Sequence, residues 1–326
     1  MALFLFGMNL MSDHLNKIAG SKAEILLSKL TNKPLKGAVM GAAVTSLIQS
    51  SSASCAMTIS LVESNILQLN SAIAIIIGSI LGTSATGWII AYSSVRFGNN
   101  FAMLFSPYVI SAFFAIVGIV FKVFIHQKRI KRIGEIFLGF SILMLGINTI
   151  SEAVAPLKES VGINNTISSV DNVFILFLIG ILIAAVLQSA SASVGILQSI
   201  SVIGILNMHL IVPMLLGIGI GASLPIVLAA TGKNNNAKRC AFSYVFVDTL
   251  GALIIGSTYY AIINLFNISE LSIAINSVTI AAMNTIYRLI IFIMFIPFTG
   301  LIEIISKKAI KTKKQKRKEM VTVENE

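Results

Sequence analysis

The chain has 326 residues, of which 56% are hydrophobic and 11% are charged, and its formal net charge is +11. Because soluble domains carry about a quarter of their residues as charged side chains, this composition excludes a soluble protein and indicates a membrane protein. The basic residues lie between hydrophobic stretches and gather on no single face, so nucleic acid is not an expected partner.

Apolar stretches predict the membrane spans in chain order. The start, MALFLFGMNLMSDH, has no basic first segment and no cleavage site of small residues, so it is interpreted as a first span and not as a signal peptide. Further spans are expected where the apolar residues approach or exceed the roughly 20 that cross a hydrocarbon core. These stretches are 71–92, 101–125, 209–230, 240–266 and 286–302. Several spans rule out a peripheral enzyme.

An internal repeat divides the chain into two halves. Gln49 aligns with Gln188 at a shift of 139 residues (188 − 49), and the same shift aligns residues 3–91 with 142–230 without a gap. The register is held by glycines, asparagines and serines. The matched pairs are Gly7/Gly146, Asn9/Asn148, Ser12/Ser151, Gly41/Gly180, Ser50/Ser189, Ser52/Ser191, Ser54/Ser193, Gly78/Gly217 and Gly82/Gly221. Two homologous halves are therefore expected.

Each half contains an apolar stretch that a Gln/Ser cluster interrupts. The pieces beside the cluster are about a dozen residues long and too short to cross a membrane alone, so each stretch is predicted to be a re-entrant helical hairpin without a net crossing. The hairpins are expected at about 35–69 and 172–206. Each half then has three crossings, an odd number, so the second half should be inverted relative to the first.

The predicted fold is an all-α integral membrane protein with two inverted-topology repeats, each of three transmembrane helices and a re-entrant hairpin, plus one extra C-terminal transmembrane helix. The repeats are expected at 1–132 and 133–270, the extra helix at 271–305 and a basic cytoplasmic tail at 306–326. Lys and Arg favour cytoplasmic loops, which places the N-terminus outside the cell membrane and the C-terminus in the cytoplasm. The tail is interpreted as solvated and lipid-facing.

Two polar clusters lie at predicted mid-membrane depth, TSLIQSSSAS at 45–54 and AAVLQSASAS at 184–193. Unsatisfied polar groups and non-helical backbone cost several kcal/mol in hydrocarbon, so both clusters should face protein or a water-filled cavity. N–H groups at helix ends favour an anion, while free carbonyls and Ser or Thr hydroxyls can coordinate sodium. The pattern favours an oxyanion with Na⁺; the structural alternative is close helix packing.

At these residues the sequence resembles the sodium/phosphate cotransporter family, the type II transporters and their bacterial relatives. LFLFGMNLMSDHL, TNKP, TSLIQSSSAS and the following Gly–Thr/Ser segment look like the family's first repeat, while LQSASAS, GIGIGAS and AKRCAFSYVFVDTLG look like its second. The resemblance covers almost the whole chain and implies Na⁺-coupled phosphate uptake. It implies Gln49, Ser50, Ser51, Gln188 and Ser189 for phosphate, and Ser52, Thr83, Ser84, Ser191 and Ser223 for sodium. The chain departs from the family's pattern at Ile80, Ala190, Gly219, Ala222, Tyr244 and Asp248.

Three charged residues lie in or beside the predicted spans. Asp248 is an intramembrane carboxylate and therefore a candidate sodium ligand, unless it pairs with Lys238 or Arg239. Glu63 is expected at the interface, at the end of the first hairpin. Arg288 begins the last predicted span and is expected to snorkel toward the outer surface.

The leading hypothesis is a Na⁺-coupled secondary active symporter that imports inorganic phosphate by alternating access, with anion and Na⁺ bound at the midplane between the hairpins. The alternatives are a Na⁺-coupled symporter of another small oxyanion or carboxylate, or a non-transporting phosphate-binding membrane scaffold or sensor. Enzyme chemistry has no support, and neither a cofactor nor a metal other than sodium is expected. The expected partners are phosphate, Na⁺ and membrane lipid, and a homodimer is left open.

Overall fold

The computed structural model describes residues 1–28, 33–95, 102–156, 172–201, 204, 206–266 and 274–311. These residues form helices joined by short connections, with one isolated β-bridge between Asn207 and Ala274, so the predicted all-α class is confirmed for them. The helices are α1 Ala2–Ser28, α2 Pro34–Ile48, α3 Ser51–Glu63, α4 Leu69–Gly82, α5 Ser84–Tyr92, η1 Ala102–Phe105, α6 Pro107–Phe124, α7 Lys128–Val154, α9 Val173–Leu187, α10 Ala190–Ser201, α11 Met208–Gly221, α12 Leu224–Ala230, α13 Asn235–Phe266, α14 Ser277–Phe295, η4 Ile296–Phe298 and α15 Thr299–Ala309.

Six helical segments of the described chain are long and apolar enough to cross a membrane. They are Leu69–Tyr92, Pro107–Phe124, Lys128–Val154, Met208–Ala230, Asn235–Phe266 and Ser277–Ala309. The five stretches predicted from the sequence coincide with or overlap five of them, and the chain is a multi-pass membrane protein. α1 is helical but is not one of the six, so its crossing stays a prediction. Part of the TNKP motif, part of the second hairpin stretch and the tail from 312 onward lie outside the described residues.

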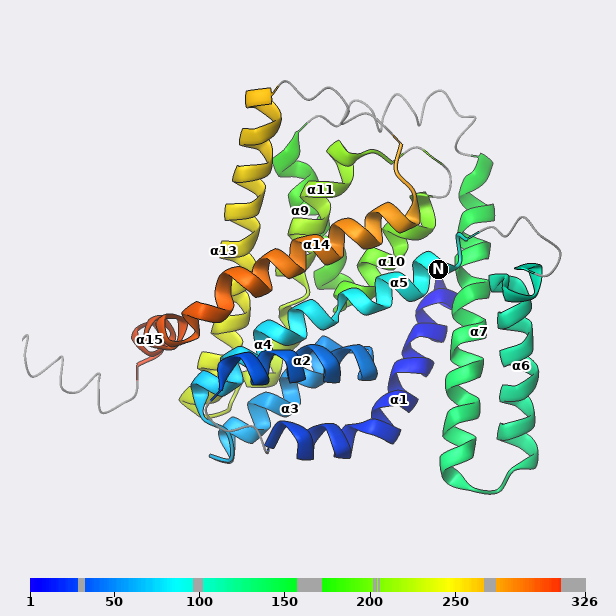
Figure 1. Ribbon diagram of the computed structural model, residues 1–326, viewed down its shortest axis with the longest axis horizontal. Coiled ribbons are helices and arrows are strands. Elements are labelled where there is room, and N and C mark those ends of the chain that lie inside the picture. The colour runs from blue at the N-terminus through cyan, green and yellow to red at the C-terminus, as the bar shows by residue number, and fades with distance from the viewer. Residues whose placement is uncertain are drawn as a thin grey trace, which may run out of the picture.

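The helices form three groups. Figure 1 shows α6 and α7 side by side at one edge of the molecule with α1 next to α7, and α13 toward the opposite edge. Between these edges α5 and α14 lie side by side, with α2, α3 and α4 on one side of them and α9, α10 and α11 on the other. α6 packs on α7 through the rings of Phe114 and Phe137, whose centroids are 4.6 Å apart. Its other face is apolar and exposed, as lipid contact requires.

The two halves repeat the same close helix packing at the predicted shift. α2 packs against α4, and α9 packs against α11. A methyl group on Gly41 would collide with the backbone of Ile75, and one on Gly180 would collide with that of Met214, which follows Ile75 by 139 residues (214 − 75). Small residues therefore let the backbones approach in both pairs. These contacts support the predicted repeat, whose inverted orientation and boundaries at 132, 270 and 305 stay predictions.

The contact between α1 and α7 exchanges its partners under the same shift. Gly7 lies against the backbone of Leu143, and Gly146 lies against the backbone of Phe4. Since Gly146 is the counterpart of Gly7 and Leu143 is the counterpart of Phe4, each contact turns into the other when 139 residues are added or subtracted. A two-fold axis between two copies produces reciprocal contacts of this kind.

Candidate functional site

Each Gln/Ser cluster begins at a glutamine with a left-handed backbone. Gln49 directly follows α2 and has a φ of 60°, and Gln188 directly follows α9 and has a φ of 53°. A positive φ is uncommon for residues other than glycine, asparagine and aspartate, so its presence at both matched positions marks two sharp turns of the same kind. The helices therefore end where the sequence predicts the two bends.

A serine caps the helix that follows each turn. The Ser50 hydroxyl oxygen accepts a hydrogen bond of 3.2 Å from the Ala53 N–H, and that of Ser189 accepts one of 3.2 Å from the Ala192 N–H. The first turns of α3 and α10 hold further N–H groups that have no partner within the helix, and the partial positive charge at a helix start favours an anion.

The two turns border one cavity of about 180 Å³ whose lining is mostly polar. Ligand pockets for larger organic molecules begin at roughly 300 Å³, so this space suits a small hydrophilic ligand. All five residues predicted for phosphate border it, as do two of those predicted for sodium. The lining residues are Met8, Asn9, Ser12 and Asp13 from α1, Gln49, Ser50, Ser51 and Ser52 from the first cluster, Leu187, Gln188, Ser189, Ala190 and Ser191 from the second, and Ala222.

Hydrogen bonds fix the Gln49 side chain within the first turn. Its Nε2 donates to the carbonyl oxygen of Ser46, and its Oε1 accepts a hydrogen bond of 2.7 Å from the hydroxyl of Thr86 in α5. The Ser46 hydroxyl in turn donates to the carbonyl of Gly82 at 3.2 Å. The first turn is therefore tied to the segment in which α4 ends and α5 begins.

Three residues predicted for sodium do not border this cavity. Thr83, Ser84 and Ser223 lie where α4 meets α5 and where α11 meets α12. Their hydroxyls donate to backbone carbonyls three or four residues earlier, at 3.0, 2.6 and 2.7 Å respectively. The structure therefore does not gather them with Ser52 and Ser191 into one set.

Asp248 is fully buried in α13, and neither of its carboxylate oxygens has a hydrogen-bond partner among the described residues. The hydroxyls of Tyr244 and Tyr287 are also buried without a partner there. A methyl group on Gly219 would lie 3.2 Å from the Tyr287 hydroxyl and 3.5 Å from the Asp248 carboxyl carbon. Tyr244 lies close to both Asp248 and Ser51 of the first turn. Buried polar groups without partners in a protein call for a bound water or ion.

Two expectations for charged residues are wrong. Arg239 does not pair with Asp248, because its Nε and Nη2 donate to the carbonyl of Ile310 at 3.1 and 2.8 Å. Lys238, the other predicted partner, makes no ion pair with that carboxylate either. Arg288 does not snorkel, because it is 0% exposed and its Nη1 donates to the carbonyl of Ile80 at 3.1 Å. It lies midway along α14, which begins before the predicted span.

The sequence analysis missed the contribution of α1 to the cavity. Asn9, Ser12 and Asp13 line it, and the Ser12 hydroxyl donates to the carbonyl of Ile48, directly before the first turn, at 3.2 Å. Asn9 and Ser12 served only as markers of the repeat. Their exact recurrence as Asn148 and Ser151 in α7 is the signal that could have identified them as site residues.

Comparison with known proteins identifies related membrane proteins. Residues 3–152 match the family described as Na+/Pi-cotransporter. “Putative inorganic phosphate export protein YjbB” of Salmonella typhimurium is 24% identical over 311 residues, 95% of this chain and 54% of that protein. “Uncharacterized protein YqeW” of Bacillus subtilis is 28% identical over 253 residues, 77% of this chain and 78% of that protein. “Sodium-dependent phosphate transport protein 2B” of Homo sapiens is 34% identical over 113 residues, 34% of this chain and 16% of that protein.

The relatives differ in length and in the direction that their names give. The chain spans about half the length of the YjbB proteins, 54% of the one from Salmonella typhimurium and 45% of the one from Escherichia coli. Those two names state phosphate export, whereas the human name states sodium-dependent phosphate transport. No solved structure matches the chain.

Proposed function

The match over residues 3–152 places the chain in the Na+/Pi-cotransporter family, a transporter family and not an enzyme family, and we propose that it moves inorganic phosphate across the membrane together with Na⁺. The observation that carries the proposal is the polar cavity of about 180 Å³ between the two Gln/Ser clusters. Phosphate binds in this cavity, at the start of α3 and of α10. The predicted residues Gln49, Ser50, Ser51, Gln188 and Ser189 supply its hydrogen bonds.

The charge of the cavity lining explains why sodium is required. Among the described lining residues none is basic, and Asp13 is acidic. Helix starts compensate only part of a phosphate charge, since each acts as about half a positive charge. Removing the remaining charge from water is expensive unless a cation accompanies it. Na⁺ bound at Ser52 and Ser191 therefore raises the affinity for phosphate, and by linkage phosphate raises the affinity for Na⁺.

A second part of the proposed sodium machinery lies behind the first turn. The Asp248 carboxylate and the hydroxyls of Tyr244 and Tyr287 offer oxygen atoms that lack a hydrogen-bond donor in the described structure. Tyr244 connects this group to Ser51, which borders the phosphate cavity. Thr83, Ser84 and Ser223 stay in the proposal as further ligands, because a hydroxyl that donates to a helix carbonyl can still offer its oxygen to Na⁺.

The direction of transport has two candidates. Coupling to an inward Na⁺ gradient gives phosphate import, with the two halves alternating the access of the cavity between the two sides. Phosphate export is the second candidate, favoured by the printed name of the relative that covers 95% of this chain. The coupling ion decides between them, because an inward Na⁺ gradient drives a symporter only inward.

The test is ³²P-labelled phosphate accumulation in proteoliposomes that contain the purified full chain. An inward Na⁺ gradient should drive accumulation, and an inward K⁺ gradient of equal size should not. Gln49→Ala and Gln188→Ala should each abolish the Na⁺-driven flux while the protein remains folded. Gln68→Ala is the matched control, because Gln68 is exposed at the start of α4 and its side chain makes no cap hydrogen bond.

The other outcomes separate the alternatives. Undiminished uptake in both cavity variants would refute the proposed site. Phosphate efflux from loaded vesicles without a Na⁺ requirement would favour the export candidate. Stronger competition by sulfate, arsenate or a dicarboxylate than by unlabelled phosphate would favour another substrate. Na⁺-dependent phosphate binding in detergent without any flux would favour the scaffold or sensor.

A further inference from the structure

A second and larger cavity lies far along the chain from the Gln/Ser clusters. It is a groove of about 400 Å³ bordered by α12, the start of α13 and the residue after α15. Its volume is within the range of roughly 300–1,000 Å³ that holds organic ligands. The lining residues are Val227, Ala230, Thr231, Gly232, Lys238, Ala241, Phe242, Val245 and Ile310.

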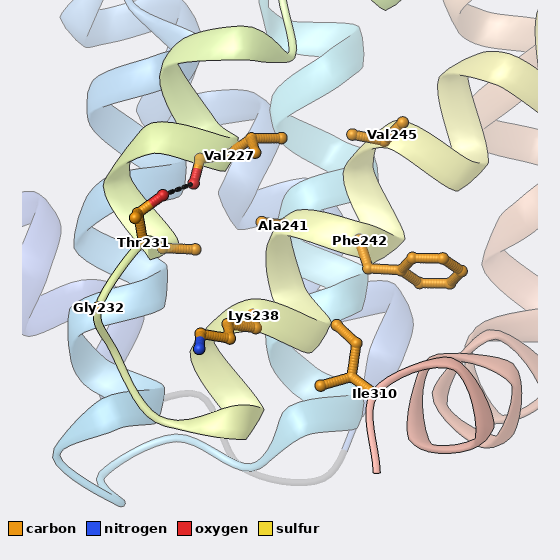
Figure 2. A pocket seen from close by; sticks show the side chains of 9 residues that line it. Val227, Thr231, Gly232, Lys238, Ala241, Phe242, Val245 and Ile310 are labelled. Carbon is orange, nitrogen blue, oxygen red and sulfur yellow. Dashed lines mark hydrogen bonds between the residues drawn. The ribbon is translucent and has the colours of Figure 1, made fainter.

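The lining of the groove is apolar except at one end. Figure 2 shows Lys238 and the Gly232 turn at one end of the groove and Val227 and Val245 at the other. Lys238 and Val245 are seven residues apart on α13, which corresponds to about 10 Å along the helix. The Thr231 hydroxyl is occupied by the carbonyl of Val227 at 3.1 Å. The interior of the groove therefore suits a hydrocarbon chain and is unsuited to free phosphate.

The basic side chains around this end differ in whether their charge is engaged. Lys233 pairs with Glu63 at 2.8 Å, and Arg239 is held by the Ile310 carbonyl at 3.1 and 2.8 Å. No hydrogen bond or ion pair of the described residues engages the Lys238 ammonium, which is exposed. The groove thus combines an apolar interior with one uncompensated positive charge at its mouth.

The surroundings show which phase the groove faces. Val227 and Leu228 on the α12 wall are 41% and 55% exposed, so this wall faces lipid. Asn234 and Lys238, at the start of α13, are exposed polar residues. The groove therefore runs from the polar boundary of the membrane into its hydrocarbon region. The tail that begins beyond Lys311 continues as TKKQKRK, which adds positive charge to the sequence at this boundary.

We propose that this groove binds an anionic phospholipid, with the headgroup phosphate at the Lys238 ammonium and one acyl chain between α12 and α13. A lysine near a membrane surface attracts anionic lipid by about 1 kcal/mol, which corresponds to about a five-fold change in affinity. The bound lipid bridges α12 to α13 and so stabilises their packing. This binding is separate from phosphate transport and is measurable without substrate.

The test uses the purified, delipidated full chain and native mass spectrometry with phosphatidylglycerol or phosphatidylcholine of identical acyl chains. Phosphatidylglycerol should bind more tightly. Lys238→Gln should weaken its binding about five-fold and leave phosphatidylcholine unchanged, while Lys238→Arg should retain it. Val245→Trp, which fills the groove, should weaken both lipids. Lys308→Gln is the control, because Lys308 is an exposed lysine at the end of α15 that does not line the groove.

Three results would overturn the proposal. The first is equal affinity of the wild-type protein for the two lipids. The second is an equal loss in Lys238→Gln and Lys308→Gln, which would indicate attraction to the whole basic surface. The third is displacement of phosphatidylglycerol by a peptide of residues 312–326, which would assign the groove to the tail. Failure of the transport assay would affect none of these measurements.

Discussion

Thr86 is expected to act on phosphate transport through Gln49. Thr86 is 1% exposed in α5, and its hydroxyl donates to the Gln49 Oε1 at 2.7 Å. Thr86→Val keeps the shape of the side chain and removes this donor. A neutral hydrogen bond contributes about 0.5–1.5 kcal/mol, and a central value of about 1 kcal/mol corresponds to about a five-fold change in affinity.

The free protein then has to order the Gln49 side chain when phosphate binds, so the cost falls on substrate binding. The expected result is a phosphate KM about five-fold higher with a nearly unchanged maximal rate, measured as Na⁺-driven ³²P uptake in proteoliposomes. Thr86→Ser keeps the hydroxyl and should transport like the wild type. Thr149→Val is the matched control, because Thr149 is exposed in α7 and its hydroxyl donates to its own helix. Equal impairment of the Ser and Val variants at position 86 would refute the reasoning.

Three further predictions concern stability and ion binding. Gln198→Met should lower the thermal unfolding temperature in detergent, because the carbonyls of Gly87 and Ser277 each lose a buried donor at 2.9 Å, at about 1–3 kcal/mol each; an unchanged temperature would contradict the role of these hydrogen bonds. Gly146→Val should destabilise the α1–α7 contact by about 1–3 kcal/mol in the same assay, whereas Gly300→Val, at a position with open space, should not. Asp248→Asn should raise the Na⁺ concentration for half-maximal uptake about ten-fold, because a charged ligand is lost; an unshifted Na⁺ curve would remove this residue from the sodium machinery.

The helix breaks were predictable because the two polar clusters interrupt otherwise apolar stretches. A glutamine followed by serines has no inexpensive place in a lipid-facing helix, and the structure places a left-handed turn at Gln49 and at Gln188. The same reasoning located the hydrophobic spans. It could not find Asn9 and Ser12 as lining residues, since polar side chains near the end of an apolar stretch are equally compatible with the membrane interface.

The error at Arg288 has a different physical origin. The polar residues Ser277, Asn284 and Thr285 lower the hydropathy of the first turns of α14, so the predicted span began too late and Arg288 seemed to lie at its edge. In the structure these residues accept hydrogen bonds from Gln198, Arg288 and Trp88 respectively. Pairing between helices that are distant in sequence is not readable from hydropathy, and it makes a polar helix start compatible with burial.

The reciprocal contact of α1 with α7 limits how these helices can move. A pair of contacts that is mapped onto itself by a half-turn survives when one helix pivots about that axis. It does not survive sliding, because a shift along the helix would bring side chains into positions where Gly7 and Gly146 now admit the opposite backbone. Relative motion at this crossing is therefore confined to a swivel, and translation along the helix axes is sterically blocked.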